Sequence, residues 1–318
     1  MKTGVVARLM KENVVIVALL LMVLIMAAIS PSFRTLENLN NIMMQIAIYG
    51  IVAFGMTFAI ICGEFDLSCG ALMGVVTILF TDISKKSGVV PAVLACFAFC
   101  LAVGLVNGFL VAKIKMSAFV ATLATSIALK GFALNYTSGK PINNVNEKIN
   151  SFGNGSFLGI PVIVWFFIGV LLISLYVLRY TKFGRGIYAT GGSMEVARMA
   201  GINVTFYKIS IFVILGVTTS VAGMLMAARL SAGNALYGND LSMTVVAAVV
   251  IGGTLLTGGK GNALKTLWGM LVMGVLFNTL MILGVQANWQ NVIRGVILIA
   301  VIVAGAVFSK KNTRARVL

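Results

Sequence analysis

The sequence predicts an all-α integral membrane protein with about ten transmembrane segments, two of them short or broken. Of its 318 residues, 60% are apolar and only 10% are Asp, Glu, Lys or Arg, and the mean hydropathy is +1.05. A soluble globular chain carries roughly a quarter charged residues, so this chain has too little polar surface to face water on all sides. Its apolar stretches also lack the period-two alternation of barrel strands. These observations exclude a soluble domain and an outer-membrane barrel.

Eight stretches of the chain reach or approach the length that crosses a membrane, about 20 residues of helix. They are residues 14–29, 42–62, 89–112, 116–136, 157–178, 209–228, 266–285 and 291–308. Two further stretches, 67–80 and 241–256, are shorter and rich in Gly, Ser and Thr, and we expect broken or half-spanning helices there. Segment 14–29 has the basic start of a signal peptide, but Pro31 follows the small residues where cleavage would occur. We therefore interpret it as an uncleaved first helix.

The positive charges predict how these segments are oriented. A net charge of +16 would suggest nucleic acid in a soluble domain, but here the Lys and Arg residues lie beside apolar runs, where they set topology. If all ten segments cross and both termini are cytoplasmic, 16 of the 24 fall on the inner side. These are Lys2, Arg8, Lys11, Lys113, Lys115, Arg179, Lys182, Arg185, Arg198, Lys208, Lys260, Lys265, Lys310, Lys311, Arg314 and Arg316. Without the two short crossings, the basic loop 179–208 would lie outside, so ten crossings fit better.

Two parts of the chain suggest an internal duplication. The tripeptide Asp-Leu-Ser opens both short segments, at 66–68 and 240–242, and an Asn follows 41 and 38 residues after the two acids. Four spans lie between the segments, so they run in opposite directions, as in transporters built from inverted 5+5 repeats with discontinuous helices. Broken helices leave backbone groups that only protein or a watery cavity can satisfy. The candidate pathway residues are therefore Asp66, Ser68, Gly70, Asn107, Asp240, Gly252, Gly253 and Asn278.

The inner loop at 179–208 contains the pattern of a short amphipathic helix. Ser193 can cap this helix, Glu195 lies in its first turn, and Gly201 can end it in a left-handed conformation. Its apolar face consists of Val196, Met199 and Ala200. On these residues alone, the helix is either a connector at the membrane interface or a docking point for a soluble partner.

Nothing in the sequence indicates enzyme chemistry. There is no His, and no Cys-x-x-Cys pair that would suggest zinc, haem or a disulfide framework. The free thiols expected in apolar surroundings are Cys62, Cys69, Cys96 and Cys100. Residues 252–261 are Gly-rich, but a phosphate-binding loop would need Gly at Thr254 and Ser or Thr at Gly261. We therefore expect no ATPase, cofactor or metal site in this chain, and a tight turn between helices at 252–261.

Four blocks of residues carry a resemblance to a known family. Residues 63–70, Gly-Glu-Phe-Asp-Leu-Ser-Cys-Gly, are similar to the family's Gly-Gly-Ile-Asp-Leu-Ser-Val-Gly. Residues 181–204 are similar to its loop ending in Gly-Ile-Asn-Val, and residues 247–261 and 289–303 match two further blocks. From Asn38 onward, the chain resembles the permease subunits of sugar-type ABC importers, the family of ribose, xylose and galactose permeases.

The resemblance implies a permease of the bacterial inner membrane, with one transmembrane domain over residues 1–318 and both termini cytoplasmic. In this family the loop at 179–208 couples the permease to a separate ABC ATPase, which binds ATP and Mg and would dock on Glu195, Ala197 and Gly201. The resemblance further implies a homodimer or paired permeases, and an extracytoplasmic binding protein that delivers a sugar or a similar small polar solute. A nucleic-acid partner is not expected.

Three departures from the family pattern leave the solute and the acids open to other interpretations. Glu64 replaces a Gly, Ser193 replaces an Asn, and residues 242–244 are Ser-Met-Thr where the family usually has Glu-Leu-Asp. Autoinducer-2 and nucleosides are therefore alternatives to a sugar. Because acids at membrane depth are usually functional, Glu64, Asp66 and Asp240 could bind a coupling ion in a secondary transporter. The other interpretation is that they cap broken helices or line the pathway.

Overall fold

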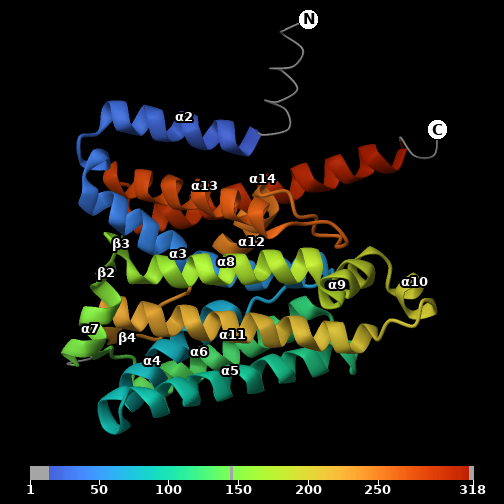
Figure 1. Ribbon diagram of the computed structural model, residues 1–318, viewed down its shortest axis with the longest axis horizontal. Helices are drawn as coiled ribbons and strands as arrows, with labels where there is room; N and C mark the ends of the chain where they lie inside the picture. The colour runs from blue at the N-terminus through green and yellow to red at the C-terminus, as the bar shows by residue number, and fades with distance from the viewer. Residues whose placement is uncertain (1–13, 144–145, 315–318) are drawn as a thin grey trace, which may run out of the picture.

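The helices of this protein lie roughly along one long axis, as the computed structural model of residues 14–143 and 146–314 shows (Figure 1). The long helices are α2 (Val14–Ile29), α3 (Leu36–Ile61), α4 (Cys69–Ser87), α5 (Val89–Ala112), α6 (Ala118–Thr137), α8 (Val162–Tyr180), α11 (Val204–Leu230), α13 (Ala263–Ile282) and α14 (Ala287–Arg314). The shorter helices are η1 (Ser32–Arg34), α7 (Glu147–Asn154), α9 (Lys182–Gly192), α10 (Met194–Met199) and α12 (Leu241–Ile251). The strands are β1 (Ile142–Asn143), β2 (Ser156–Phe157), β3 (Ile160–Pro161) and β4 (Ala232–Gly233).

Six of these helices are long and apolar enough to cross a membrane: α3, α5, α6, α8, α11 and α13, within the described residues. This finding confirms the all-α membrane class. The start of α2 and the end of α14 both point toward the end of the bundle that carries α9 and α10, while α7 lies at the opposite end (Figure 1). Four of the charges that the topology prediction used, Lys2, Arg8, Lys11 and Arg316, lie outside the described residues.

Most bounds of the expected spans lie within three residues of the helix bounds, but α3, α11 and α14 begin four to six residues earlier than expected, α8 begins five residues later, and α14 ends six residues later. Helix α3 begins at Leu36 rather than at residue 42, because the Thr35 side chain accepts the Asn38 N–H and caps the helix there. The expected span 157–178 is wrong at its start, since residues 156–157 pair with 160–161 in a hairpin and α8 begins only at Val162.

The two segments that were expected to be short have different lengths. Helix α12 is short, at 11 residues. Helix α4 is a full 19 residues, so the expectation of a half-length helix ending at residue 80 is wrong. Its last turn is held by an ion pair between Asp82 and Lys86 at 2.8 Å, and the Tyr136 hydroxyl donates to the same carboxylate at 2.5 Å. These bonds offset the polar composition that suggested an earlier end.

Helix α3 lies at the centre of the bundle, and α5, α6 and α8 lie toward its surface. From Ile46 to Ile61, every residue of α3 except Tyr49 is buried, and α11 packs against α3, α4 and α5. The outer helices expose large apolar side chains, among them Leu94, Leu105, Ile127 and Ile173. Such surfaces suit a lipid environment, where apolar side chains face hydrocarbon.

The segment between α11 and α12 folds back into the bundle along α4. Within this segment, β4 pairs with β1, and Asn234 exchanges hydrogen bonds of 3.2 Å with the hydroxyl of Thr77. Further on, Gly238 lies so close to Gly70 that a Cβ on either residue would strike the other's carbonyl oxygen. Because 234 and 238 meet α4 at 77 and 70, the segment runs antiparallel to α4. It therefore places the start of α12 inside the bundle, where Leu241 is fully buried.

Candidate translocation pathway and coupling loop

Asp66 is at the centre of a buried polar cluster at the start of α4. Its carboxylate accepts the Ser68 backbone N–H at 2.6 Å and the Ser68 hydroxyl at 2.5 Å. The Asn107 amide of α5 donates to Ser68 Oγ at 3.0 Å and to Asp66 at 3.4 Å, and it accepts the Thr125 hydroxyl of α6 at 2.7 Å. Three predicted pathway residues, Asp66, Ser68 and Asn107, therefore lie together. Their bonds join α4, α5 and α6 in the interior.

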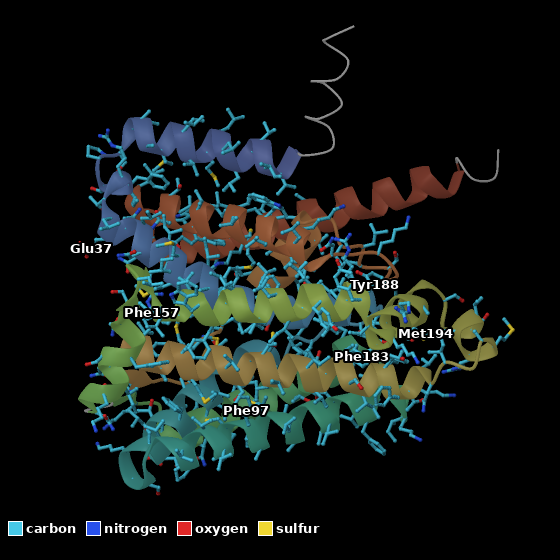
Figure 2. All side chains as sticks on the ribbon, viewed as in Figure 1. Glu37, Phe97, Phe157, Phe183, Tyr188 and Met194 are labelled. Atoms are coloured by element: carbon cyan, nitrogen blue, oxygen red, sulfur yellow. The ribbon has the colours of Figure 1, made fainter. Side chains whose placement is uncertain are left out.

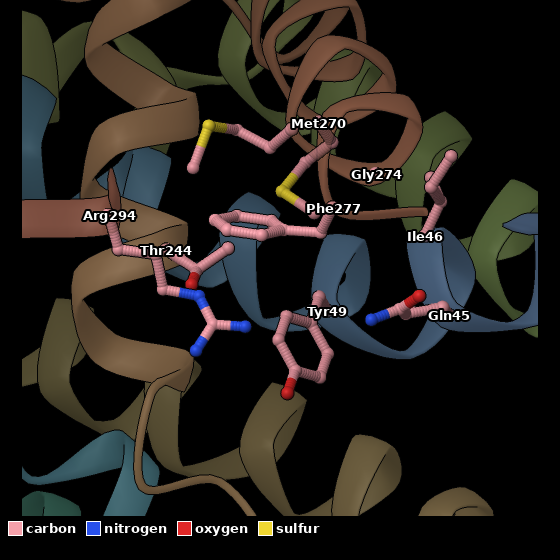
Figure 3. Close-up of a pocket in the computed structure, with 9 residues that line it drawn as sticks. Gln45, Ile46, Tyr49, Thr244, Met270, Gly274, Phe277 and Arg294 are labelled. Atoms are coloured by element: carbon pink, nitrogen blue, oxygen red, sulfur yellow. The ribbon is translucent and has the colours of Figure 1, made fainter. Parts of the chain in front are cut away.

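Asp240 belongs to a second cluster, built from α3, α12, α13 and α14. Its carboxylate pairs with Arg294 at 2.6 Å and accepts the Tyr49 hydroxyl at 3.4 Å. The Arg294 guanidinium carbon also lies 4.3 Å from the centre of the Phe277 ring, in cation–π contact. Figure 3 shows the Arg294 and Tyr49 side chains converging beneath this ring. The Asp240 side chain makes no hydrogen bond to the start of α12, so the capping interpretation is wrong for this acid.

Ser242 connects the two clusters. Its hydroxyl donates to the Leu67 carbonyl at 3.0 Å and accepts the Gly70 N–H at 3.0 Å. The starts of α4 and α12 thus meet inside the bundle, although the two segments are far apart in sequence. The predicted pathway residue Gly70 lies at this contact, where its missing Cβ leaves room for Ser242 and Gly238.

The other predicted pathway residues lie away from these clusters. Gly252 and Gly253 follow the far end of α12, about 16 Å of helix from Asp240. Gly252 is packed on the Lys265 backbone, and Gly253 has a left-handed φ of 94°. Asn278 exchanges two hydrogen bonds, of 3.2 and 2.7 Å, with Asn38, which joins α13 to the first turn of α3.

The short helix predicted in the inner loop exists as α10. The Ser193 side chain accepts the Val196 N–H at 3.3 Å, and Gly201 has a φ of 78°, so both the predicted cap and the predicted stop are confirmed. Figure 2 shows Met194 of this helix at the opposite end of the bundle from Glu37. Glu195 is exposed, as are Val196 at 58% and Met199 at 81%. Helix α10 therefore presents an apolar tip beside an acid.

Two of the three residues assigned to ATPase docking are exposed and one is not. Glu195 and Gly201 are open to solvent, whereas Ala197 is only 3% exposed. The small side chain of Ala197 lets α10 lie against its own chain. A partner approaching the tip would meet Glu195 and Met199 first.

Helix α9, before α10, was not expected because four of its eleven residues are Gly. It packs with unusually close backbone contacts. A Cβ on Gly191 would strike the Ile61 carbonyl oxygen, and the Gly259 N–H donates to that same oxygen at 2.8 Å. The Tyr188 hydroxyl donates to the Gly261 carbonyl at 2.8 Å. The end of α3, helix α9 and the turn after α12 are therefore in direct contact at the α10 end.

Glu64 is paired with Lys208 of α11, and both side chains are 12% exposed. This ion pair uses the acid that departs from the family pattern. Since the pair is mostly buried, it holds the segment before α4 against the helix that follows α10. A bound coupling ion at Glu64 would have to compete with this lysine.

Three residues of the Asp240 cluster were not among the predicted site residues: Tyr49, Phe277 and Arg294. Tyr49 and Phe277 look like ordinary aromatic residues of apolar spans. Arg294 gave a signal, because it is a cation within an apolar stretch, and such residues usually have a partner and a function. Among the described residues, no group of three His, Cys, Asp or Glu side chains could hold a metal ion. The four cysteines are free thiols in buried positions, which confirms the expectation for them.

Comparisons of this sequence with known proteins identify its family. Residues 38–302 match the family described as branched-chain amino acid transport system / permease component. The chain is 38% identical to the ribose import permease protein RbsC of Escherichia coli (strain K12), over 92% of this chain and 93% of that protein. It is 40% identical to RbsC of Bacillus subtilis (strain 168), over 89% of each. It is 33% identical to the L-arabinose transport system permease protein AraH of Escherichia coli (strain K12), over 86% of this chain and 84% of that protein. No solved structure matches the chain.

Proposed function

This chain belongs to the family described as branched-chain amino acid transport system / permease component and is the permease subunit of an ABC importer, and we propose that it imports a sugar of pentose size. The chain is not an enzyme, because ATP hydrolysis in such importers resides in a separate subunit. The family description names amino acids, but the three relatives above are named for ribose and arabinose and align over most of their lengths. An ion-coupled carrier is not favoured, since these relatives are import or transport-system permeases.

The proposed topology has ten membrane segments, with both termini and α10 on the cytoplasmic side of a bacterial inner membrane. Two observations support it. The start of α2 and the end of α14 point toward α10 (Figure 1), and the sequence places 16 of 24 positive residues in the loops on that side. The meeting of α4 and α12 at Ser242 supports an inverted repeat, in which two discontinuous segments meet inside the membrane.

The proposed coupling surface is the tip of α10, which docks on the ATPase subunit. One observation carries this assignment: a capped helix at the end of the bundle exposes Glu195 and Met199, with Met199 81% exposed. An exposed methionine beside an acid suits a protein groove with a basic rim. The ATPase subunit supplies the ATP and Mg sites. A second permease copy or a paired permease completes the pathway, and a binding protein delivers the solute to the far face.

The interior polar clusters are proposed to line the pathway, beginning with Asp240. The Asp240 side chain is 27% exposed, whereas Asp66 is 4% exposed and held by its neighbours. Solute can reach Asp240 more directly. Asp66, Ser68 and Asn107 then fix the shape of the wall, while Gly252 and Gly253 let α12 turn at the cytoplasmic side.

The partner assignment is tested by purifying the chain from its native membrane in mild detergent and identifying the proteins that accompany it. We expect an ATPase with a phosphate-binding loop and a soluble binding protein that releases ribose or arabinose on denaturation. Recovery of the chain with no ATPase would contradict the coupling role. A binding protein that releases an amino acid, a nucleoside or autoinducer-2 would contradict the proposed sugar substrate but not the coupling role.

A further inference from the structure

A small cavity lies beside Asp240 and Arg294, about halfway along α3. Tyr49 on its wall is 13 residues from the start of α3 and 12 from its end, or about 18–20 Å from either end. The lining comes from four helices: Gln45 and Tyr49 of α3, Thr244 of α12, Met270 and Phe277 of α13, and Arg294 of α14 (Figure 3). This depth is near the middle of the membrane, where transporters hold their solutes.

The cavity has the mixture of groups that recognises a neutral polyhydroxylated molecule. Arg294 is the only charged residue in its lining, and Asp240 pairs with it directly, so the charges of these two side chains balance. Gln45, Tyr49 and Thr244 add uncharged polar groups. The faces of Phe277 and Met270 supply apolar surface. The hydroxyl groups of a neutral solute can bond to the ion pair and to the polar side chains, and its C–H groups can pack on the aromatic ring. A charged solute would neutralise one member of the ion pair and leave the charge of the other uncompensated.

Arg294 has a hydrogen-bonding position to spare. Its Nη2 pairs with Asp240 and its Nη1 donates to Asn291 at 2.8 Å. Its Nε is buried and has no partner within the described part of the chain. A buried donor without a partner is costly, and the structure provides nothing to satisfy it. The donor therefore marks a place where a ligand acceptor would be stabilised.

The cavity is small in this state, with room for about one water molecule. The Arg294 side chain is paired with the Asp240 carboxylate and lies over the Phe277 ring, so it fills the space that a solute would need. Moving this one side chain would uncover a carboxylate and an aromatic face at once.

We propose that Asp240, Arg294, Tyr49 and Phe277 form a solute subsite for a neutral polyhydroxylated molecule, and that Arg294 closes the subsite when solute is absent. In the open subsite, solute hydroxyls donate to Asp240 and accept from Arg294, and the ring of Phe277 packs on the carbon skeleton. This inference rests on the proposed function and assigns the residues that bind the solute.

The test uses the permease assembled with its ATPase and binding protein in proteoliposomes, with Thr244→Cys as a reporter inside the cavity. The alkylation rate of this thiol by a small maleimide is measured in the vanadate-trapped complex. The rate without solute is compared with the rate in D-ribose or L-arabinose. We expect the pentose to slow alkylation about tenfold, and Asp240→Asn to remove most of this protection, since a charged hydrogen bond is lost. Ser87→Cys, at the exposed end of α4 and on a helix that does not line the cavity, is the control and should react equally in all conditions.

Closure by Arg294 is tested in the same vesicles without solute. Arg294→Gln, and separately Arg294→Lys in case the first variant assembles poorly, should make Thr244→Cys react severalfold faster. Unchanged reactivity in the variants that assemble, or pentose protection that survives Asp240→Asn, would overturn the subsite. Uptake of radiolabelled pentose by the wild-type vesicles separates the two claims. Uptake without protection of Thr244→Cys overturns the subsite alone, whereas absence of uptake overturns the proposed sugar function with it.

Discussion

Lys208, near the start of α11, is paired with Glu64, in the segment that leads into α4. The pair lies between the two regions that we propose an importer must connect, since α11 follows the proposed coupling helix α10 and α4 begins at the Asp66 cluster of the proposed pathway. Movement of α10 against an ATPase would therefore be transmitted to the start of α4 through a mostly buried ion pair.

Lys208→Met should destabilise the protein, because it leaves Glu64 charged and unpaired in a site only 12% exposed. Removing one member of a buried pair costs about 3–5 kcal/mol. The double variant Lys208→Met with Glu64→Gln should regain much of this loss. Thermal unfolding of the detergent-purified protein measures both effects. Lys140→Met is the control, because Lys140 is exposed in the loop after α6 and should change little; equal losses in the two lysine variants would contradict the assignment.

Glu195→Arg should abolish ATPase docking while leaving the fold intact. The change reverses the charge at the exposed tip of α10, where Arg185 and Arg198 already supply positive charge to the same loop. Glu37→Arg is a matched control, since Glu37 also lies in the first turn of a capped helix but at the opposite end of the bundle (Figure 2). Co-purification of the ATPase should be lost for Glu195→Arg and kept for Glu37→Arg. If both variants retain the ATPase, α10 is only a connector.

Gly191→Ala should destabilise the contact between α9 and the end of α3. Its new Cβ would meet the Ile61 carbonyl oxygen, and overpacking of this kind costs about 1–3 kcal/mol. The neighbouring Gly192 has open space at the same position, so Gly192→Ala should be neutral or stabilise by up to about 1 kcal/mol. The melting temperatures of the two variants should therefore differ in a defined order, and the reverse order would show that α9 is packed differently.

Gly70→Ala should disrupt the meeting of α4 and α12. A Cβ there would strike the Gly238 carbonyl oxygen and the Ser242 hydroxyl, which bonds to both Gly70 and Leu67. We expect a lower membrane level of the protein together with reduced uptake. Gly131→Ala on α6 is the control, since open space surrounds that position. Normal expression and transport by Gly70→Ala would show that the two segments separate without consequence.

The sequence was sufficient to predict those features that depend on neighbours along the chain. Helix α10 was predicted with its cap at Ser193 and its stop at Gly201, because both signals act within one turn. Helix α9 was missed because its glycines favour loops, and only the close approach of Ile61 and Tyr207 explains why they lie in a helix.

The candidate site, too, could be predicted only in part. Asp66 and Asn107 could be associated through the Asp-Leu-Ser repeat, and the structure joins them at 3.4 Å. The same repeat suggested Asn278, which instead bonds to Asn38. The pairing of Asp240 with Arg294 joins residues of different helices, and nothing in the spacing of the chain specifies which acid an isolated arginine meets. The packing of α12, α13 and α14 determines which acid Arg294 meets.

We propose that this chain moves a sugar only when an ATPase drives it. The most direct measurement is uptake of radiolabelled D-ribose and L-arabinose into proteoliposomes that contain the chain, its ATPase and its binding protein. ATP is supplied on the side of α10, or is replaced by proton and sodium gradients. We expect accumulation of at least one pentose with ATP and none with either gradient alone. Gradient-driven accumulation by the chain without its ATPase would contradict it.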